Sequence, residues 1–304
     1  EEGDNRVVTV DTIDGSRSEI PDGQVLVLYG EQLRVREQLW RAAGVAVPVF
    51  SLRSEHSYGV GDFGDLRRFV DWAVLTGMKV IQLLPVNDTT TSGGWHDSYP
   101  YNIISAFALH PHYVDVEAAG ILRSRQQMTK FRRRQQELNA LSYSDYEAVG
   151  RVKQEYLQLL FAEKGKTVTD SKEYHDFVSD NDHWLKSYAA YLSDRNGQSS
   201  AFTYYLQFIL HTQLKAAADY ARSKGVILKG DLPIGVNRES VETREHPLLF
   251  HLDSQTGAPP DVFTMQGQNW GFPTDRGESA DSSRPADLNS HLVDWFRHRL
   301  KWIA

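Results

Sequence analysis

The stretch KVIQLLPV, residues 79–86, constrains the fold of this chain more strongly than any other segment. It is almost continuously apolar, which is typical of a parallel strand that is buried on both faces. Just before it, apolar residues recur at helical spacing, at Leu66, Phe69, Val70, Ala73 and Val74. A helix that leads directly into a buried strand indicates a layered α/β structure.

The two ends of this predicted helix also carry recognisable signals. Asp62 or Asp65 can cap its first turn, and Gly77 can end its last turn. Upstream, GVAVPVF at residues 44–50 is a further strand candidate. The two strands and the helix between them therefore make one βαβ unit of ordinary length.

A second helix–strand pair lies far downstream. Residues 202–225 predict a long helix that ends on Gly225, and VILKGDLP, residues 226–233, predicts the strand that follows it. Alternating strands and helices predict an α/β fold with a parallel sheet covered by helices. The sheet can be an open doubly wound sheet or a (β/α)8 barrel.

The long segment between these units is rich in helical patterns. Because structureless loops of this length are uncommon, we interpret it as a helical subdomain inserted into the sheet domain. It contains the arginine-rich stretch RSRQQMTKFRRRQQ, residues 123–136. Such a cluster is more often a solvated helix face than a phosphate site, and we interpret it in that way.

The composition argues against several classes of function. A formal charge of -7 gives no basic surface for nucleic acid or anionic membranes, so we expect neither as a partner. The chain has no cysteine, and its 11 histidines form no H-E-x-x-H pattern, so we expect no metal site. Neither a glycine-rich phosphate loop nor a G-x-S-x-G motif is present. We therefore expect no nucleotide cofactor and no serine nucleophile.

The beginning of the chain gives an expectation about its compartment. EEGDNRVVTV lacks the charged and apolar regions of a secretion signal, and no apolar run approaches the length of a membrane span. We therefore expect a cytoplasmic protein. Because position 1 is not Met, the chain is compatible with a piece of a longer product.

Polar side chains follow the predicted strands where each strand ends. Asn87 and Asp88 come after the second strand, and Asp231 comes after the third. In both α/β architectures this edge of a parallel sheet is where ligands bind. An aspartate just beyond a strand also commonly caps a turn, so both roles are open for Asp231.

Two long loops add aromatic, amide and carboxylate groups. Residues 83–102 contain Trp95, Tyr99 and Tyr101, and residues 257–273 contain Asp261, Gln266, Gln268, Asn269 and Trp270. Aromatic faces beside amides suit sugar rings, which present an apolar face and a rim of hydroxyls. The alternative for the first loop is an aromatic loop packed for structural reasons alone. We favour a carbohydrate ligand.

Six stretches give the chain a family resemblance: WRAAGVAVPVFSLRSEHSYGVGDFGDL, LLPVNDTT, DSYPYN, LKGDLPIGVNRESVE, GAPPD and GQNWGFPT. In this order, from about residue 40 to 274, they resemble the 4-α-glucanotransferases of glycoside hydrolase family 77. The disproportionating-enzyme-2 branch is the more similar one. The resemblance implies a (β/α)8 TIM barrel of the α-amylase type with a helical insertion at about 118–200 and only its first three strands in this chain. Residues 1–38 are then the end of a starch-binding-module-like β domain or a linker, and 39–304 the N-terminal part of the barrel domain.

The resemblance also implies an activity and its substrates. Family members transfer α-1,4-glucan segments between maltooligosaccharides, starch or glycogen by a retaining double displacement, without a cofactor. By this resemblance Asp231 hydrogen-bonds the sugar beside the bond that breaks, and Tyr101 stacks on it. The other residues that we predict to bind substrate are Asn87, Asp97, Ser98, Asp261, Gln268 and Trp270.

The chain differs from the family in its catalytic carboxylates. The segment HLVDWFRHRLKWIA, residues 291–304, resembles the helix that precedes the strand of the nucleophile. We therefore expect the nucleophile and the acid/base residue beyond Ala304, and we expect the 304-residue chain alone to be inactive. The alternative is a non-catalytic glucan-binding or scaffolding protein derived from this family. The pattern leaves the oligomeric state open.

Overall fold

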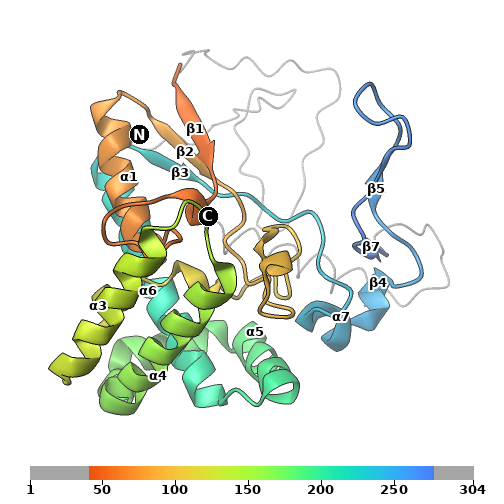
Figure 1. Cartoon of the computed structure of the whole chain (residues 1–304). Helices are drawn as coiled ribbons and strands as arrows, with labels where there is room; N and C mark the ends of the chain where they lie inside the picture. Colours follow the sequence, from red (N-terminus) through yellow and green to blue (C-terminus); the bar gives the residue numbers. More distant parts are fainter. Residues whose placement is uncertain (1–40, 277–304) are drawn as a thin grey trace, which may run out of the picture. The chain divides into compact units, whose positions relative to one another are not determined.

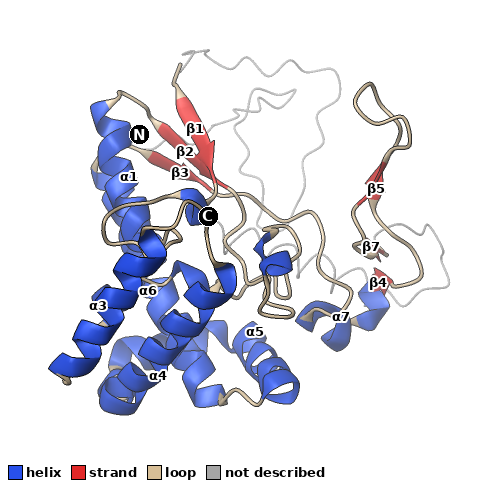
Figure 2. Ribbon diagram, in the orientation of Figure 1, coloured by secondary structure: helices blue, strands red, loops and turns tan. Residues whose placement is uncertain are grey.

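A parallel sheet of three strands organises residues 41–276, the part of the chain that the computed structural model describes (Figures 1 and 2). The strands are β1 (Gly44–Val47), β2 (Val80–Leu83) and β3 (Ile227–Lys229). They lie in the order β1-β2-β3, and β2 pairs in parallel with both neighbours. The structure thus confirms the expected α/β fold with a parallel sheet.

The middle strand differs from expectation in how it is buried. Side chains along β2 alternate between half-buried and buried, with Ile81 fully enclosed. The expectation that this strand is buried on both faces is therefore wrong for the described residues. Helices cover one face of the sheet, and Ile81 and Leu83 pack against them. Val80 and Gln82 lie on the other face, where their side chains are partly exposed.

Helix α1 (Phe63–Leu75) begins and ends as its sequence predicts. Asp62 is the N-cap, and its Oδ1 accepts the N–H groups of Gly64 at 3.0 Å and Asp65 at 3.1 Å. Asp65 completes a capping box because its Oδ2 accepts the Asp62 N–H at 3.3 Å. Gly77 follows the helix with φ +75, a conformation that glycine adopts without strain.

The segment between β2 and β3 is mainly helical (Figure 2). It contains α3 (Arg125–Asn139), α4 (Tyr146–Thr169), α5 (Lys172–Asn196) and α6 (Ser200–Ser223), with the single turn α2 (Val116–Ala119) ahead of them. Helix α6 leads into β3 and packs against α1, α4 and α5. It therefore belongs both to the helix layer of the sheet and to the helical subdomain.

Shorter elements complete the described chain. After β3 come α7 (Val241–Glu245) and two small antiparallel ribbons, β4 (Phe250–His251) with β7 (Thr274–Asp275), and β5 (Gly257–Ala258) with β6 (Gln268–Asn269). Single 3-10 turns occur at η1 (Val49–Ser51), η2 (Trp95–Ser98), η3 (Pro111–Tyr113) and η4 (Pro247–Leu249).

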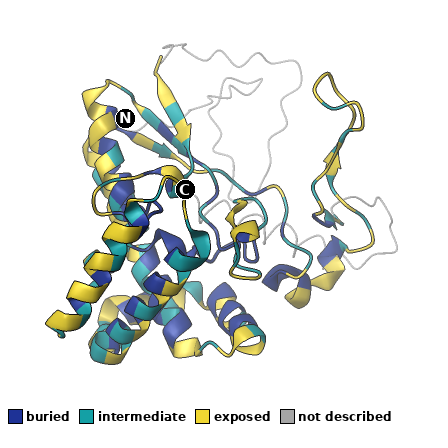
Figure 3. Ribbon diagram, in the orientation of Figure 1, coloured by how far each residue is buried: buried dark blue, intermediate teal, exposed yellow. Residues whose placement is uncertain are grey.

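The buried hydrophobic residues of the described chain form two clusters. Figure 3 marks the buried residues in dark blue along the ribbon. The larger cluster lies where β1, β2, α1, α3, α4 and α6 meet, and it includes Leu66, Ile81, Phe131, Tyr156 and Leu210. The smaller cluster joins the loop around residues 103–108 to α5 and α7. The helical subdomain thus shares its core with the sheet instead of standing apart from it.

The arginine-rich helix α3 is neutralised by acidic neighbours. Each of four basic side chains has a carboxylate within 4 Å: Lys130 and Arg134 face Glu155, Arg132 faces Glu117, and Arg133 faces Glu137. These pairs are solvent-exposed and contribute little to stability. The interpretation as a solvated helix face is confirmed.

Two expectations fall on parts of the chain that the structure does not describe. The predicted starch-binding-module-like segment, residues 1–38, and the predicted helix at 291–304 both lie outside the described residues. Within residues 41–276, no helical segment has both the length and the apolar composition of a membrane span.

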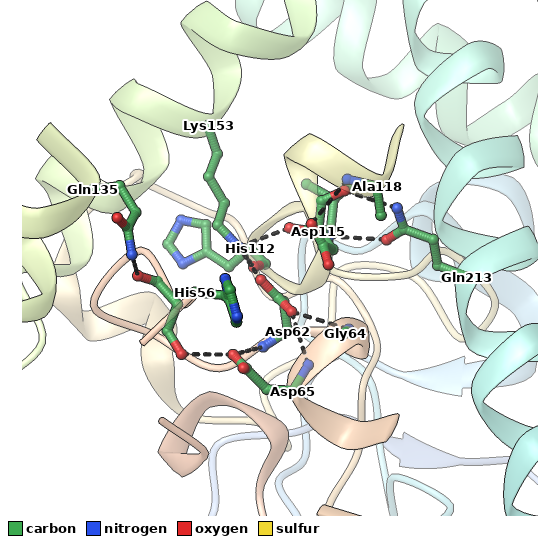
Figure 4. A network of polar contacts seen from close by, with 12 residues as sticks. His56, Asp62, Gly64, Asp65, His112, Asp115, Ala118, Gln135, Lys153 and Gln213 are labelled. Atoms are coloured by element: carbon green, nitrogen blue, oxygen red, sulfur yellow. Dashed lines mark hydrogen bonds and ion pairs between the residues drawn. The ribbon is translucent and has the colours of Figure 1, made fainter. Parts of the chain in front are cut away.

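A buried lysine connects the helical subdomain to the sheet (Figure 4). Lys153 of α4 has only 2% of its side chain exposed, and its Nζ donates to the carbonyl oxygens of His112 at 2.6 Å and Val114 at 2.7 Å. The same Nζ lies 3.5 Å from Oδ2 of Asp62, the cap of α1. Burial raises the pKa of Asp62 to about 7, although the neighbouring Lys153 charge opposes this shift.

Side-chain amides of α3 bind the turn between β1 and α1 from another direction. Gln135 Nε2 donates to the carbonyl oxygens of Glu55 at 2.8 Å and Ser57 at 2.7 Å. Asn139 Nδ2 donates to the Ser54 carbonyl at 2.7 Å. Helix α3 therefore holds this turn, and α4 holds the start of α1 that follows it.

The raised pKa of Asp62 predicts a specific pH dependence. Its folded pKa of about 7 lies above the ordinary 3.8, so the folded chain holds a proton that the unfolded chain releases between these values. The contribution of Asp62 to stability is therefore complete below pH 4 and is lost as the pH rises through 7. Asp62→Asn keeps the cap but has no group that titrates in this range. As the pH rises from 4 to 7, we expect its free energy of unfolding to increase relative to that of the wild type by at most about 1.4 kcal/mol per pH unit.

Urea unfolding from pH 4.5 to 8 measures this difference. Asp194→Asn, at an exposed position of α5, is the matched control and should follow the wild type at every pH. Parallel stability curves for the wild type and Asp62→Asn would contradict the assignment of a protonated, buried Asp62.

Candidate functional site

The carboxyl ends of β2 and β3 lie at one edge of the sheet because neighbouring parallel strands run in the same direction. Asn87 and Asp88 follow β2, and Asp231 follows β3. Asn87 and Asp231 both line a groove of about 580 Å³ that runs along β3 and α6. The structure therefore brings Asn87 and Asp231 together, whereas Asp88 lines a different cavity.

Tyr101 and Asp231 form a direct pair although 130 residues separate them in the chain. The Tyr101 hydroxyl donates to Asp231 Oδ2 at 2.7 Å. Burial raises the pKa of Tyr101 to about 12, and the hydrogen bond to Asp231 and its negative charge add to this effect. Tyr101 is therefore a neutral donor at physiological pH, with Tyr99 beside it at 5.7 Å between ring centroids.

Asp97 has a different environment from its exposed neighbour Ser98. The Asp97 carboxylate is buried and accepts the backbone N–H groups of Thr91 at 2.9 Å, Ser92 at 2.8 Å and Gly93 at 2.7 Å. It holds the loop 91–93 in a tight turn. The carboxylate oxygens of Asp97 thus already accept hydrogen bonds from this loop. The contact of Asp97 with substrate stays a prediction.

Asn87 is buried and supports the backbone of the same loop region. Its Nδ2 donates to the Ala106 carbonyl at 2.8 Å, and its backbone bridges to Leu109. Asn87 also lines a second cavity of about 250 Å³, together with Asp97 and Ser98. The structure thus brings three of the predicted residues to the wall of one cavity.

The remaining predicted residues lie on the β5–β6 ribbon. Asp261 is exposed and accepts the N–H groups of Thr264 and Phe263, both at 2.8 Å, which lowers its pKa. Gln268 Oε1 accepts the indole N–H of Trp270 at 2.9 Å. Among residues 41–276, no hydrogen bond joins these three side chains to Tyr101 or Asp231.

The ribbon is nevertheless attached close to the loop that follows Asp231. Gly235 packs so tightly on Phe272 that an added Cβ would lie 2.8 Å from the Phe272 Cβ. Arg238 donates to the carbonyl oxygens of Leu252 and Ser254. The base of the ribbon is therefore fixed to the same segment that carries Asp231.

Sequence reasoning missed the histidines that lie behind this loop. His110 and His112, which we did not predict as site residues, are both buried, and burial holds the pKa of each below its ordinary value. His110 Nε2 lies 2.8 Å from the hydroxyl of Tyr146 on α4. The described residues contain no group of three or more side chains suited to hold a metal ion.

Comparisons with known proteins give one consistent result. The sequence profile of the family described as 4-alpha-glucanotransferase matches residues 47–201 and 191–302. The chain is 40% identical to the 4-alpha-glucanotransferase DPE2 of Oryza sativa subsp. japonica, over 99% of this chain and 34% of the rice protein. It is 29% identical to a 4-alpha-glucanotransferase of Chlamydia muridarum, over 85% of this chain and 52% of that protein.

Two solved structures share the fold. The amylomaltase from Corynebacterium glutamicum has a TM-score of 0.70 at 22% identity, covering 86% of this chain and 39% of that protein. The amylomaltase from Streptococcus agalactiae in complex with acarbose has a TM-score of 0.67 at 24% identity, covering 86% of this chain and 57% of that protein. The chain thus spans a third to somewhat more than half of the length of these relatives.

The Tyr101–Asp231 pair predicts an energetic coupling between the two side chains. We expect a double-mutant cycle with Tyr101→Phe and Asp231→Asn to give a coupling free energy of about 1 kcal/mol, because the hydrogen bond is partly buried and its acceptor is charged. Urea unfolding of the wild type, both single variants and the double variant measures this value. Additive effects of the two substitutions would show that the pair is not formed in solution.

Proposed function

Because this chain belongs to the 4-alpha-glucanotransferase family, we propose that it supplies the sugar-facing part of an enzyme that transfers α-1,4-glucan segments. Its donors and acceptors are maltooligosaccharides, starch or glycogen. We propose further that β1, β2 and β3 are the first three strands of a (β/α)8 barrel. Their parallel order, with helices packed on one face, supports this assignment.

The observation that carries the proposal is the Tyr101–Asp231 pair at the carboxyl ends of the strands. In (β/α)8 barrels this end of the sheet carries the active site. The pair offers a glucose ring two kinds of contact, an aromatic face for its C–H groups and a carboxylate for its hydroxyls. Only one Asp231 oxygen is used by Tyr101, so the other oxygen can accept a sugar hydroxyl.

The chemistry of transfer requires two further carboxyl groups. A retaining double displacement uses a nucleophile and an acid/base residue about 5 to 5.5 Å apart. The carboxylates described near the strand ends already have other partners. Asp97 organises a loop, and Asp88 accepts the Tyr188 hydroxyl at 2.6 Å and the Thr90 N–H at 3.0 Å. We therefore place both catalytic groups outside these 304 residues and give Asp231 the role of holding sugar hydroxyls.

The remaining predicted residues extend the site to neighbouring sugar units. Trp270 offers a half-buried ring whose orientation is fixed by Gln268, and Asp261 lies at the turn of the same ribbon. Ser98 is exposed beside the cavity that Asn87 and Asp97 line. These groups combine aromatic faces with amides and hydroxyls, which suits an oligosaccharide.

The second candidate function is that of a non-catalytic glucan-binding or scaffolding protein. The observation that favours it is the engagement of Asp88, Asp97 and Asp231 by loop or tyrosine donors. Sugar-facing loops without a free pair of carboxylates can bind glucan but cannot cleave it. Both functions require glucan binding, but only the enzyme cleaves and transfers glucan.

We expect the 304-residue chain alone to produce no glucose from maltose, because transfer needs a nucleophile and an acid/base residue that we place elsewhere. A coupled glucose assay, with buffer as blank and a complete amylomaltase as positive control, measures this. Glucose production that scales with the concentration of the pure chain would refute the placement of the catalytic groups.

We expect Trp270→Ala to weaken maltotriose binding by about 1 to 3 kcal/mol, because an aromatic anchor loses its stacking face. Arg133→Ala, on the solvated face of α3, is the control and should bind as the wild type does. Titration calorimetry on the three proteins measures both values. Equal affinities for the wild type and Trp270→Ala would remove Trp270 from the site.

A further inference from the structure

A third cavity lies inside the helical subdomain, away from the predicted sugar-binding residues. It has a volume of about 210 Å³ and is lined by side chains of α4, α5 and α6 and of the loop after β2. It includes none of the eight side chains that were predicted to bind substrate. Sites for drug-sized ligands measure about 300 to 1,000 Å³, so this cavity suits one small ring.

His112 gives this cavity an unused polar group. The residue is 8% exposed and lines the cavity, and its ring nitrogens have no hydrogen-bond partner within residues 41–276. Gly150 of α4 leaves room for the ring, since an added Cβ would lie 2.8 Å from His112 Nε2. Burial, with His110 and Lys153 nearby, holds the pKa of His112 well below its ordinary value. The imidazole is therefore neutral and presents one donor and one acceptor.

The other charged groups deep in the cavity are already engaged. Lys153 donates to two carbonyl oxygens and faces Asp62, and Asp88 accepts from Tyr188. Glu147 at the rim accepts the Trp95 N–H at 2.9 Å. Arg151 also lines the cavity, but it is exposed to solvent. An anion in the interior would therefore lose its hydration with no free cation of the described chain beside it.

Apart from the exposed Arg151, the rest of the lining combines neutral polar groups with an apolar floor. Gln154 and Asn196 contribute amides, and the floor is formed by Leu157, Leu192, Phe202 and Leu206. An apolar surface below a rim of neutral donors and acceptors complements a hydroxylated ring, which has an apolar face and a polar edge. A phosphate or carboxylate group could pair with Arg151 only on the exposed side, so it is a poorer match for the interior.

From this arrangement we propose that the cavity between α4, α5 and α6 is a second carbohydrate site, which binds one neutral hexose ring through His112 and the amides of its rim. The choice of a hexose, among neutral polyols, rests on the proposed function. His112 and Tyr146 also line the 250 Å³ cavity that contains Asn87, Asp97 and Ser98. A bound hexose therefore lies directly behind the loop that faces the predicted substrate site.

Closing the cavity mouth tests the proposal without changing its interior. Gln154 is exposed on α4 and lines the cavity, and Gln158, one turn further along α4, is exposed and does not line it. We expect Gln154→Trp to weaken glucose binding at least tenfold and Gln158→Trp to leave it unchanged. Saturation-transfer NMR titration of the 304-residue chain with glucose measures both, and circular dichroism confirms that each variant is folded.

A second variant tests the role of the imidazole. His112→Phe keeps an aromatic ring and removes both nitrogens, so we expect it to weaken glucose binding about fivefold or more while Gln158→Trp still binds. Equal glucose binding in Gln154→Trp and Gln158→Trp overturns the proposal, as does the absence of glucose binding to the wild type. If inorganic phosphate binds instead and Gln154→Trp abolishes that binding, the site is anionic and the proposal is wrong.

Maltotriose binding separates this proposal from the proposed function. We expect Gln154→Trp to bind maltotriose as tightly as the wild type does, because the residues around Asp231 are unchanged. If the wild type does not bind maltotriose and Gln154→Trp still weakens glucose binding, the strand-end site is refuted and the cavity site is supported. The reverse pattern would refute the cavity site alone.

Discussion

The ammonium group of Lys153 is the contact on which the arrangement of the protein depends. Removing an ammonium ion from water costs several kcal/mol unless hydrogen bonds and an opposite charge replace the solvent. Here the replacements come from two other parts of the chain. The carbonyls of His112 and Val114 accept hydrogen bonds from the ammonium, and Asp62, the cap of α1, lies 3.5 Å away and supplies the opposite charge as it ionises near pH 7. Helix α4, the start of α1 and the loop after η3 are consequently held in one geometry. The helical subdomain is thus part of the framework of the sheet.

The long loop after β2 is held at several further points, and these fix where Tyr101 lies. Gln207 of α6 pairs with both backbone groups of Leu109, at 2.8 and 2.9 Å, and Glu242 of α7 accepts the Ala106 N–H at 2.6 Å. A loop anchored to two helices loses little further entropy when a ligand binds, which favours affinity. The subdomain and the sheet together therefore place Tyr101 against Asp231.

Local sequence signals were sufficient to predict the helices and strands but not the side-chain contacts between them. Capping by Asp62 and the helix end at Gly77 depend on neighbouring residues, so the sequence predicted them. Lys153 lies in a mixed polar segment of α4, and its burial depends on Asp62, which is 91 residues away. The same holds for the Tyr101–Asp231 pair, since strand-end position predicts a shared edge but no hydrogen bond. Burial on both faces was the wrong expectation for β2 because an apolar strand does not show which face helices cover.

The central claim is that glucan binds at the strand ends, between the loop of Tyr101 and the loop of Asp231. Hydrogen–deuterium exchange of the 304-residue chain, with and without saturating maltotriose, tests it directly. The account predicts slower exchange in peptides that cover residues 99–104 and 230–237, with no change in α3. Unchanged exchange in both loops, or slower exchange only in α3, would contradict it.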